Sequence, residues 1–457
     1  MKKRVFFLNA AILTASSVVM RLCNIWFRVF ICTIIGAAGM GLYQLIFSVF
    51  LLGITACTSG IGFAVTRLVA EGHNTRSAVR RCLAIALALS FAAAAALFFF
   101  SDFIALKWIG SQPAAMPLRL LAPGLPFIAA CACLRGYFLA IRNTIVPVCG
   151  EFLEQLATIG AAVLLLGLTA HPLEALMLGS TIGEVFSCAF IGVFYLVFIN
   201  KRKLHAEKSK GVFQRIVHIA LPVQCGSFLR SLLSSTENIL IPRGLKKHGA
   251  GEEGSLAQYG VMQGMVMPIL YFPSAFLSAL SMLLIPEMAE ANAGGKKEMI
   301  QNAASRAIRF TLTFSFLITS LLIVFADDLG MTFYKSAEVG NILRIMAPIV
   351  PLMYLDSVVD GMLKGLDQQL YSLKYNFSDS IMRVILIATL IPVFGMKAYI
   401  AVLFLSEIYN ASLSINRLLK VTSLEVDIIS WILTPAVGSA LLYYVLILLK
   451  KLLCFGI

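Results

Sequence analysis

Apolar segments of about 20 residues recur along the whole chain and alternate with short polar stretches. This is the length that an α-helix needs to cross the hydrocarbon core of a membrane. The pattern predicts an all-α integral membrane protein with about 13 transmembrane helices. The predicted spans are centred near residues 20, 53, 91, 130, 157, 186, 228, 271, 317, 353, 384, 406 and 439.

Short sequences recur in the same order in the two halves of the chain. "LRLLAPGLP" at Leu118–Pro126 returns as "LRIMAPIVP" at Leu343–Pro351, and "TRLVAEG" at 66–72 resembles "PEMAEAN" at 286–292. Each repeat holds six predicted spans, and an even number gives both copies the same orientation in the membrane. Parallel repeats of this kind predict two six-helix lobes that face a central cleft and rock by alternating access.

The expected domains follow from the repeat. They are an N-terminal six-helix lobe at 1–200, a cytoplasmic linker at 201–214, a C-terminal six-helix lobe at 215–420 and an additional C-terminal transmembrane helix at 421–457. Each fourth span carries a Pro-x-x-Pro pair, which favours a kink because proline frees backbone carbonyls. A structural kink and a moving gate both remain open interpretations.

The distribution of charge along the chain predicts how the protein is oriented in the membrane. The chain is 59% hydrophobic and only 13% charged, yet its formal net charge is +14. Most of the 37 lysines and arginines fall in alternate inter-span segments, which is the positive-inside bias of membrane proteins. The basic charge therefore indicates a multi-pass cell-membrane protein with a cytoplasmic N-terminus, and no nucleic-acid partner is expected.

The cysteines and histidines do not suggest a metal site. The ten cysteines are scattered, mostly within predicted spans, and none of the five histidines lies near the Cys131/Cys133 pair. Neither a zinc pattern nor a disulfide framework is visible. No metal or other cofactor is expected. A coupling cation, Na⁺ or H⁺, and the membrane potential are the open candidates for an energy source.

The first predicted span carries polar residues along one narrow stripe. Thr14, Ser17, Arg21, Asn24 and Arg28 are spaced by 3, 4, 3 and 4 residues, and a polar stripe in a membrane helix must face protein or water. Arginine suits phosphate because its planar guanidinium donates two parallel hydrogen bonds. The stripe is therefore a candidate diphosphate-binding surface.

Other intramembrane polar residues extend this hypothesis. Gln44 in the second span and Arg230 in the seventh are further candidate substrate-binding residues. The alternative is that these arginines only form intramembrane ion pairs, such as Arg28 with Glu237. Arg135 and Asp360 occupy equivalent repeat positions, and they, like Glu237, are candidates for ion coupling or ion pairing.

Several of these segments resemble a known family. The "R-x6-R" span at 21–28, "IGAAGMGLYQL" and "SGIGFAVTRLVAEG" are similar to the start of the stage V sporulation protein B family, which belongs to the multidrug/oligosaccharidyl-lipid/polysaccharide (MOP) flippase superfamily. The resemblance implies a flippase that moves undecaprenyl-diphosphate-linked oligosaccharide or a lipid II-like peptidoglycan precursor, for cell wall, spore cortex or polysaccharide synthesis. In the related lipid II flippases, cavity arginines engage the diphosphate, and Arg21 and Arg28 match that role. A second-helix arginine of those proteins has no counterpart here except Arg67, at the end of that helix.

Two other classes of protein compete with this interpretation. A cation-coupled multidrug exporter of the same superfamily would use Glu237 or Asp360 to carry the ion, although exposed arginines disfavour cationic substrates. A membrane enzyme would need a positioned acid, base or metal cluster, and the short inter-span segments show none, so the protein is not expected to be an enzyme. The expected partners are the lipid-linked glycan and membrane lipids, with wall or polysaccharide synthases as candidate protein partners.

Overall fold

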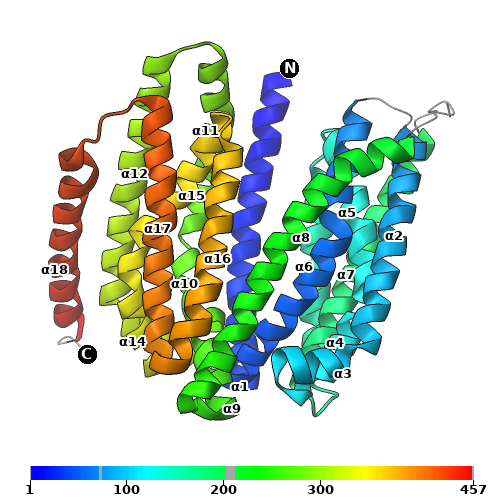
Figure 1. The fold of residues 1–457 in the computed structure, drawn as a ribbon, viewed down its shortest axis with the longest axis horizontal. Coiled ribbons are helices and arrows are strands. Elements are labelled where there is room, and N and C mark those ends of the chain that lie inside the picture. The colour runs from blue at the N-terminus through cyan, green and yellow to red at the C-terminus, as the bar shows by residue number, and fades with distance from the viewer. Residues whose placement is uncertain (1, 72–74, 202–211, 455–457) are drawn as a thin grey trace. The chain divides into compact units, whose positions relative to one another are not determined.

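The computed structural model describes residues 2–71, 75–201 and 212–454, and the side chains of these except residues 2–18, 21, 75, 200, 201, 212, 453 and 454. The described chain is helical, with no β-strand (Figure 1). By contacts it divides into two units. Unit 1 comprises residues 1–27 and 34–239, and unit 2 comprises residues 28–33 and 240–457.

Unit 1 contains most of the first eight α-helices. They are α1 (Lys2–Ala70), α2 (Thr75–Phe99), α3 (Ser101–Phe103), α4 (Ala115–Leu121), α5 (Gly124–Ala140), α6 (Ile145–Leu166), α7 (Pro172–Lys201) and α8 (Val212–Leu245). Helix α1 contains a non-helical residue at Gly36, with φ 68° and ψ −175°, a conformation that glycine adopts without a Cβ clash.

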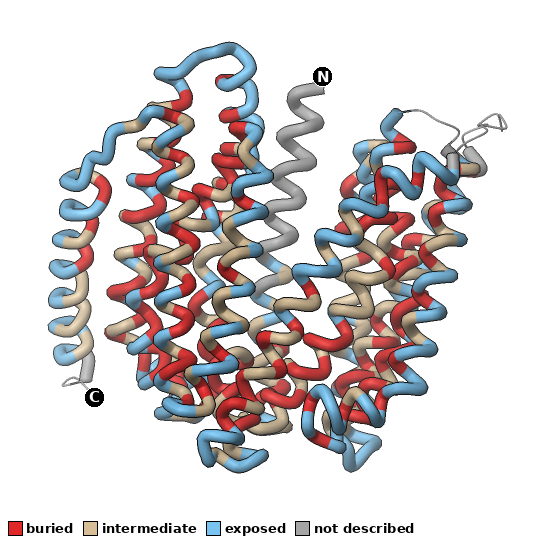
Figure 2. Tube along the Cα trace, in the orientation of Figure 1, coloured by how far each residue is buried: buried red, intermediate tan, exposed pale blue. Residues whose placement is uncertain are grey.

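Unit 2 contains the remaining helices. They are α9 (Gly251–Tyr259), α10 (Met267–Tyr271), α11 (Ser274–Ala293), α12 (Lys297–Val324), α13 (Ala326–Tyr334), α14 (Ala337–Met346), α15 (Val350–Gly365), α16 (Gln369–Phe394), α17 (Met396–Thr422) and α18 (Thr434–Cys454). Helix α18 packs on α12, where the Ser320 hydroxyl donates to the Ser439 carbonyl at 2.8 Å, and it leaves most of its other side chains exposed (Figure 2).

The predicted all-α membrane architecture is confirmed. Eleven described helical segments are long and apolar enough to cross a membrane, or twelve if the bent pair Gln112–Leu121 and Gly124–Ala140 counts as one span. The predicted number was about 13. One difference arises because α1 is counted as a single span, whereas the sequence predicts two spans there. Its apolar part of 49 residues is longer than two membrane thicknesses and contains Gly36.

The internal repeat is visible in the packing of each unit. Helix α2 packs on α5, α6 on α7 and α5 on α7 in unit 1, and α12 packs on α15, α16 on α17 and α15 on α17 in unit 2. The ion pair Asp102–Arg119 has a counterpart in Asp327–Arg344, at the same offset that joins Leu118 to Leu343. The predicted offset therefore relates residues with the same structural role.

Gly136 and Gly361 occupy equivalent positions in the repeat, and each lies close to a neighbouring helix. A Cβ on Gly136 would lie 2.8 Å from the Gly62 carbonyl oxygen, and a Cβ on Gly361 would lie 3.0 Å from the Ser281 Cβ. Gly62 and Ser281 lie shortly before the two matched segments at 66–72 and 286–292. The Pro-x-x-Pro segments also interrupt helices as predicted, with a 45° bend between the helices at 112–121 and 124–140 and a 3₁₀ turn at 347–349.

The boundary between the units differs from the predicted linker. Residues 202–211 of that linker lie outside the described part of the chain, whereas the contact boundary falls after Ile239, inside α8. The physical reason is a series of hydrogen bonds that join α8 to the second half of α1, including Gly60 N–H to Gln224 Oε1 at 2.8 Å. The division into lobes at 201–214 stays a prediction.

The α6–α7 contact makes a testable prediction about stability. A Cβ on Gly183 would lie 2.8 Å from the Glu154 carbonyl oxygen, whereas a Cβ on Gly160 would meet no atom within 4 Å. Gly183→Ala should lower the free energy of unfolding by about 1–3 kcal/mol because the helices must move apart. Gly160→Ala, the matched control, should raise it by up to about 1 kcal/mol because alanine favours the helix. Thermal unfolding in detergent would measure both, and equal effects would contradict this packing.

Candidate functional site

The predicted arginine stripe of α1 is described in part. The side chain of Arg21 lies outside the described residues, Asn24 is exposed and Arg28 is half-buried. Arg28 belongs to unit 2, where it lies close enough to Tyr334 to influence its hydroxyl electrostatically. Burial, followed by Cys32, raises the pKa of Tyr334 to about 12, and Arg28 opposes this rise.

Neither group has a conventional partner among the described residues. Among the side chains that the structure describes, no ion pair involves Arg28, and the buried Tyr334 hydroxyl has no hydrogen-bond partner. The half-buried Gln44 likewise has an unpartnered Nε2 atom. Unpaired polar groups of this kind are costly in an apolar environment, so they are candidates for contact with a ligand or water.

The polar side chains of α8 form hydrogen bonds to α1 within unit 1. The Ser235 hydroxyl donates to the Ser48 carbonyl at 2.8 Å, and Asn238 Nδ2 donates to Ser48 Oγ at 3.1 Å. Thr55 Oγ1 also donates to Ser231 Oγ at 3.3 Å. These serines and the asparagine join α8 to α1, so this face of α8 is not a free continuation of the α1 stripe.

The two charged candidates on α8 lie in contrasting surroundings. Arg230 is exposed, and no ion pair involves it among the described residues. Glu237 is only 5% exposed. Because Arg28 and Glu237 belong to different units, the predicted pairing between them stays a prediction.

Arg135 lies in a charged cluster formed by α5, α6 and α7. Its Nη2 atom lies 2.6 Å from Glu154 Oε2 and 3.2 Å from Ser187 Oγ, and its Nη1 atom lies 3.7 Å from Glu151 Oε1. Glu184 of α7 also interacts with Glu154. The guanidinium therefore compensates carboxylates within unit 1.

The equivalent helices of unit 2 place a different set of charges at the same positions. The repeat replaces Arg135 by Asp360, Glu151 by Asn376 and Glu154 by Asp379, and Ser187 corresponds to Asn410. Asp360 pairs with Lys364 Nζ at 2.6 Å, and Asp379 Oδ1 accepts from Ser406 Oγ at 2.6 Å. Arg135 and Asp360 thus each have an ion-pair partner within their own unit.

Unit 2 also contains a carboxylate that sequence reasoning missed. Asp356 lies one helical turn before Asp360, and its Oδ2 accepts from Asn410 Nδ2 at 3.0 Å. Its Oδ1 and the Oδ1 of Asn410 are buried without hydrogen-bond partners. The i, i+4 spacing of two aspartates in an apolar span was the available signal.

The described acidic groups of unit 2 are not arranged as a site for a multivalent metal ion. Within residues 2–71, 75–201 and 212–454, no group of three or more His, Cys, Asp or Glu side chains is arranged to hold a metal ion. The unpartnered Oδ1 atoms of Asp356 and Asn410 lie near the carboxylates of Asp379 and Glu407. These surroundings favour the binding of a proton or a monovalent cation over the binding of an anion. Unit 2 thus combines an acidic interior with an arginine, Arg28, that has no carboxylate partner among the described residues.

Known proteins share both sequence and fold with this chain. A family profile described as polysaccharide biosynthesis protein matches residues 7–292, and a profile described as MatE matches residues 252–389. Stage V sporulation protein B of Bacillus subtilis (strain 168) is 28% identical over 80% of this chain and 74% of its own length. Sporulation protein YkvU of the same organism is 24% identical over 69% of this chain and 72% of its own length.

Solved structures show the fold. An inward-facing multidrug resistance MATE family transporter of the MOP superfamily superposes with a TM-score of 0.67 at 15% identity, covering 90% of this chain and 96% of its own. A MOP superfamily transporter from Pyrococcus furiosus gives a TM-score of 0.64 at 16% identity, covering 91% of this chain and 95% of its own. The predicted all-helical membrane fold is therefore confirmed, and it is the fold of these structures.

Proposed function

The chain belongs to the polysaccharide biosynthesis protein family, a transporter family of the MOP superfamily, and we propose that it is a flippase for polyprenyl-diphosphate-linked glycans. Its substrates would be undecaprenyl-diphosphate-linked oligosaccharides or lipid II-like peptidoglycan precursors. The relationship to stage V sporulation protein B favours a role in wall, spore cortex or polysaccharide synthesis in the cell membrane.

The observation that carries this proposal is the pair Arg28 and Tyr334. An arginine and a hydroxyl within one unit, neither paired with a described protein carboxylate, together offer a positive charge and hydrogen-bond donors. Arginine binds phosphate by two parallel charge-assisted hydrogen bonds. The diphosphate is the part of the substrate that these groups would recognise, whereas the glycan would extend beyond them.

A transport assay in vesicles tests the proposal. Protein reconstituted into vesicles should move a fluorescent undecaprenyl-diphosphate disaccharide to the opposite leaflet faster than protein-free vesicles do. A cationic dye such as ethidium should not be transported at a comparable rate. Transport of the dye without flipping of the lipid diphosphate would reject the flippase in favour of the multidrug exporter.

The acidic interior of unit 2 favours cation coupling as the energy source, in either class of transporter. Asp356 and Asn410 each retain an unpartnered buried oxygen that a proton or Na⁺ can satisfy. Binding there would stabilise one conformational state more than the other, as coupling requires. Import of a cation would then drive export of the lipid headgroup.

Replacement of Asp356 provides a test of coupling. Asp356→Asn should retain the side-chain volume but remove the ionisable group, so transport should lose its dependence on an imposed Na⁺ or H⁺ gradient. Asp427→Asn, at an exposed carboxylate before α18, is the matched control and should keep that dependence. Gradient-stimulated flipping that is equal in both variants would exclude Asp356 as the coupling group.

A further inference from the structure

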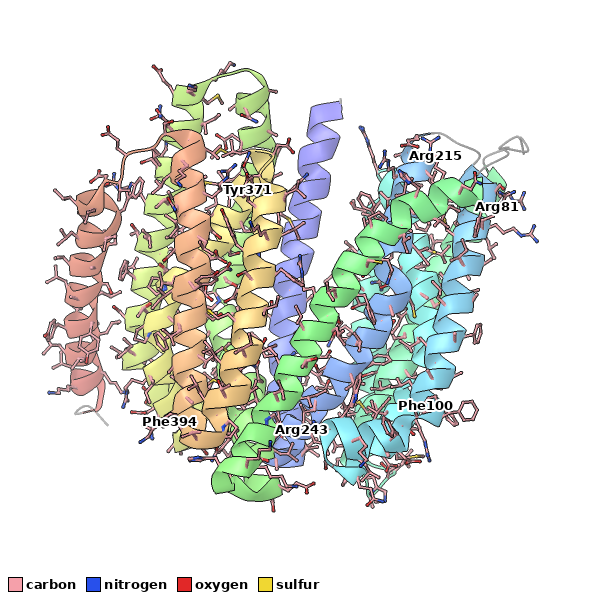
Figure 3. The ribbon with its side chains drawn as sticks, viewed as in Figure 1. Arg81, Phe100, Arg215, Arg243, Tyr371 and Phe394 are labelled. Carbon is pink, nitrogen blue, oxygen red and sulfur yellow. The ribbon has the colours of Figure 1, made fainter. Side chains whose placement is uncertain are left out.

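Exposed arginines gather at the end of unit 1 where α1 ends and α2 and α8 begin. They are Arg67 on α1, Arg76, Arg80 and Arg81 on α2, and Arg215 on α8. Only four residues separate α1 from α2, and Arg215 Nη2 reaches Glu71 Oε2 at 2.7 Å, so the three helix ends lie together. Arg81 and Arg215 are seen at this end in Figure 3.

Glu71, the acidic residue described at this surface, is already paired with two arginines. Glu71 accepts from Arg67 Nε at 3.0 Å as well as from Arg215. Within the described part of the chain, no ion pair involves Arg76, Arg80 or Arg81, and all three are exposed. The patch therefore keeps an excess of positive charge that the described residues do not compensate.

Helix stability does not explain the three arginines of α2. Arg76 lies in the first turn, where the helix dipole is positive and a cation is unfavourable, and Arg80 and Arg81 lie in the second turn, where the dipole does not stabilise a cation. The first turn of α2 also contains no acidic residue. Their charge therefore adds nothing to the stability of the helix.

The fold does not require Arg80 and Arg81 either, as the internal repeat shows. Helix α12 is the counterpart of α2, since one constant offset joins the buried Val79 to the buried Ile300 and Ser90 to Thr311. At the positions of Arg80 and Arg81, α12 carries the uncharged "QN" at 301–302. The charge at these two positions is thus specific to α2 and is not required by the shared architecture.

The position of the arginines identifies a partner. The uncharged, largely apolar run of α2 begins at Cys82, so Arg80 and Arg81 lie within one helical turn of its start. Residues at the edge of an apolar run lie in the headgroup layer of a bilayer, which is several ångströms thick on each side. Basic clusters at this level attract anionic lipid headgroups.

We propose that the ends of α1, α2 and α8 form a docking surface for the phosphate headgroups of anionic phospholipids in the adjacent leaflet. This proposal is independent of the transported substrate.

Lipid titration tests the surface directly. The full-length protein in mild detergent is titrated with dioleoylphosphatidylglycerol, and bound lipid is counted by native mass spectrometry. A variant with R76Q, R80Q and R81Q should bind with an apparent affinity lower by on the order of a hundredfold, at about fivefold per arginine. The matched control removes three charges from the equivalent end of unit 2, through K296Q, K297Q and R306Q, and should lower the affinity much less, because Glu287 and Glu298 line the same cavity as Arg306 and offset part of that charge.

Further measurements keep the result interpretable if the triple variant does not fold. Replacing the same three arginines with lysine should preserve most of the binding, because the charge remains. Raising the salt concentration around the wild-type protein should weaken binding, because the contacts are at the surface. The proposal is overturned if the folded glutamine variant binds as tightly as the wild type, if the control loses as much affinity, if phosphatidylcholine binds equally well, or if wild-type binding does not depend on salt.

Discussion

Arg28→Ala is expected to slow flipping of a lipid diphosphate by about 10-fold to 100-fold. Each charged hydrogen bond to the diphosphate contributes about 1.5–3 kcal/mol, and about 1.4 kcal/mol corresponds to a factor of ten. Arg28→Lys should give an intermediate rate because lysine keeps the charge and loses the planar fork. The measurement is the initial rate of flipping in vesicles, normalised to the amount of reconstituted protein.

The control for this prediction is an arginine with a protein partner. Arg344→Ala removes an exposed side chain that pairs with Asp327 in unit 2, and it should leave the rate near that of the wild type. The double variant Arg28→Ala/Glu237→Ala separates phosphate binding from an ion pair. Wild-type flipping in the double variant would show that Arg28 serves only to neutralise Glu237.

Arg135→Leu is expected to cause the largest loss of stability. The substitution removes the partner of Glu154 and leaves Glu151, Glu154 and Glu184 within one cluster without their cation. Removing one partner from a fully buried ion pair costs about 3–5 kcal/mol, and we expect about 2–4 kcal/mol here because the pair is partly buried, with 26% of the Arg135 and 28% of the Glu154 side chain exposed. The apparent melting temperature in detergent should fall, together with the yield of folded protein.

A second substitution should recover part of this loss. Arg135→Leu/Glu154→Leu leaves fewer uncompensated charges, so it should be more stable than Arg135→Leu alone. Arg119→Leu is the matched control, since it breaks an exposed pair with Asp102 and should cost less than about 1 kcal/mol. An Arg119→Leu protein that is as unstable as the Arg135→Leu protein would contradict the assigned role of the cluster.

The internal repeat could be predicted from sequence because its signals are local. The prolines at 123, 126, 348 and 351 lie at or within the first turn of a helix, and the matched segments around them relate the same turn in both units. The two ion pairs Asp102–Arg119 and Asp327–Arg344 then follow the same offset. Apolar length likewise predicted a membrane protein without knowledge of helix packing.

The candidate sites could be predicted less well because they depend on how helices are rotated. Periodicity places Ser231, Ser235 and Asn238 near one face of α8, but it does not say that this face bonds to α1. Several carboxylates could have paired with Arg135, and the choice of Glu154 comes from the packing of α5 against α6 and α7. Other groups, such as Asp356, were missed because their unpartnered atoms appear only once their neighbours are placed.

The most direct test of the central claim is to identify the lipids that remain bound to the protein. The full-length chain is purified in mild detergent from its native membrane, and the extracted lipids are analysed by mass spectrometry beside those of an Arg28→Ala preparation. We predict a polyprenyl-diphosphate glycan that is enriched with the wild-type protein and depleted from the variant. Equal amounts of that lipid in both preparations, or none in either, would contradict the claim that Arg28 holds a lipid diphosphate for transport.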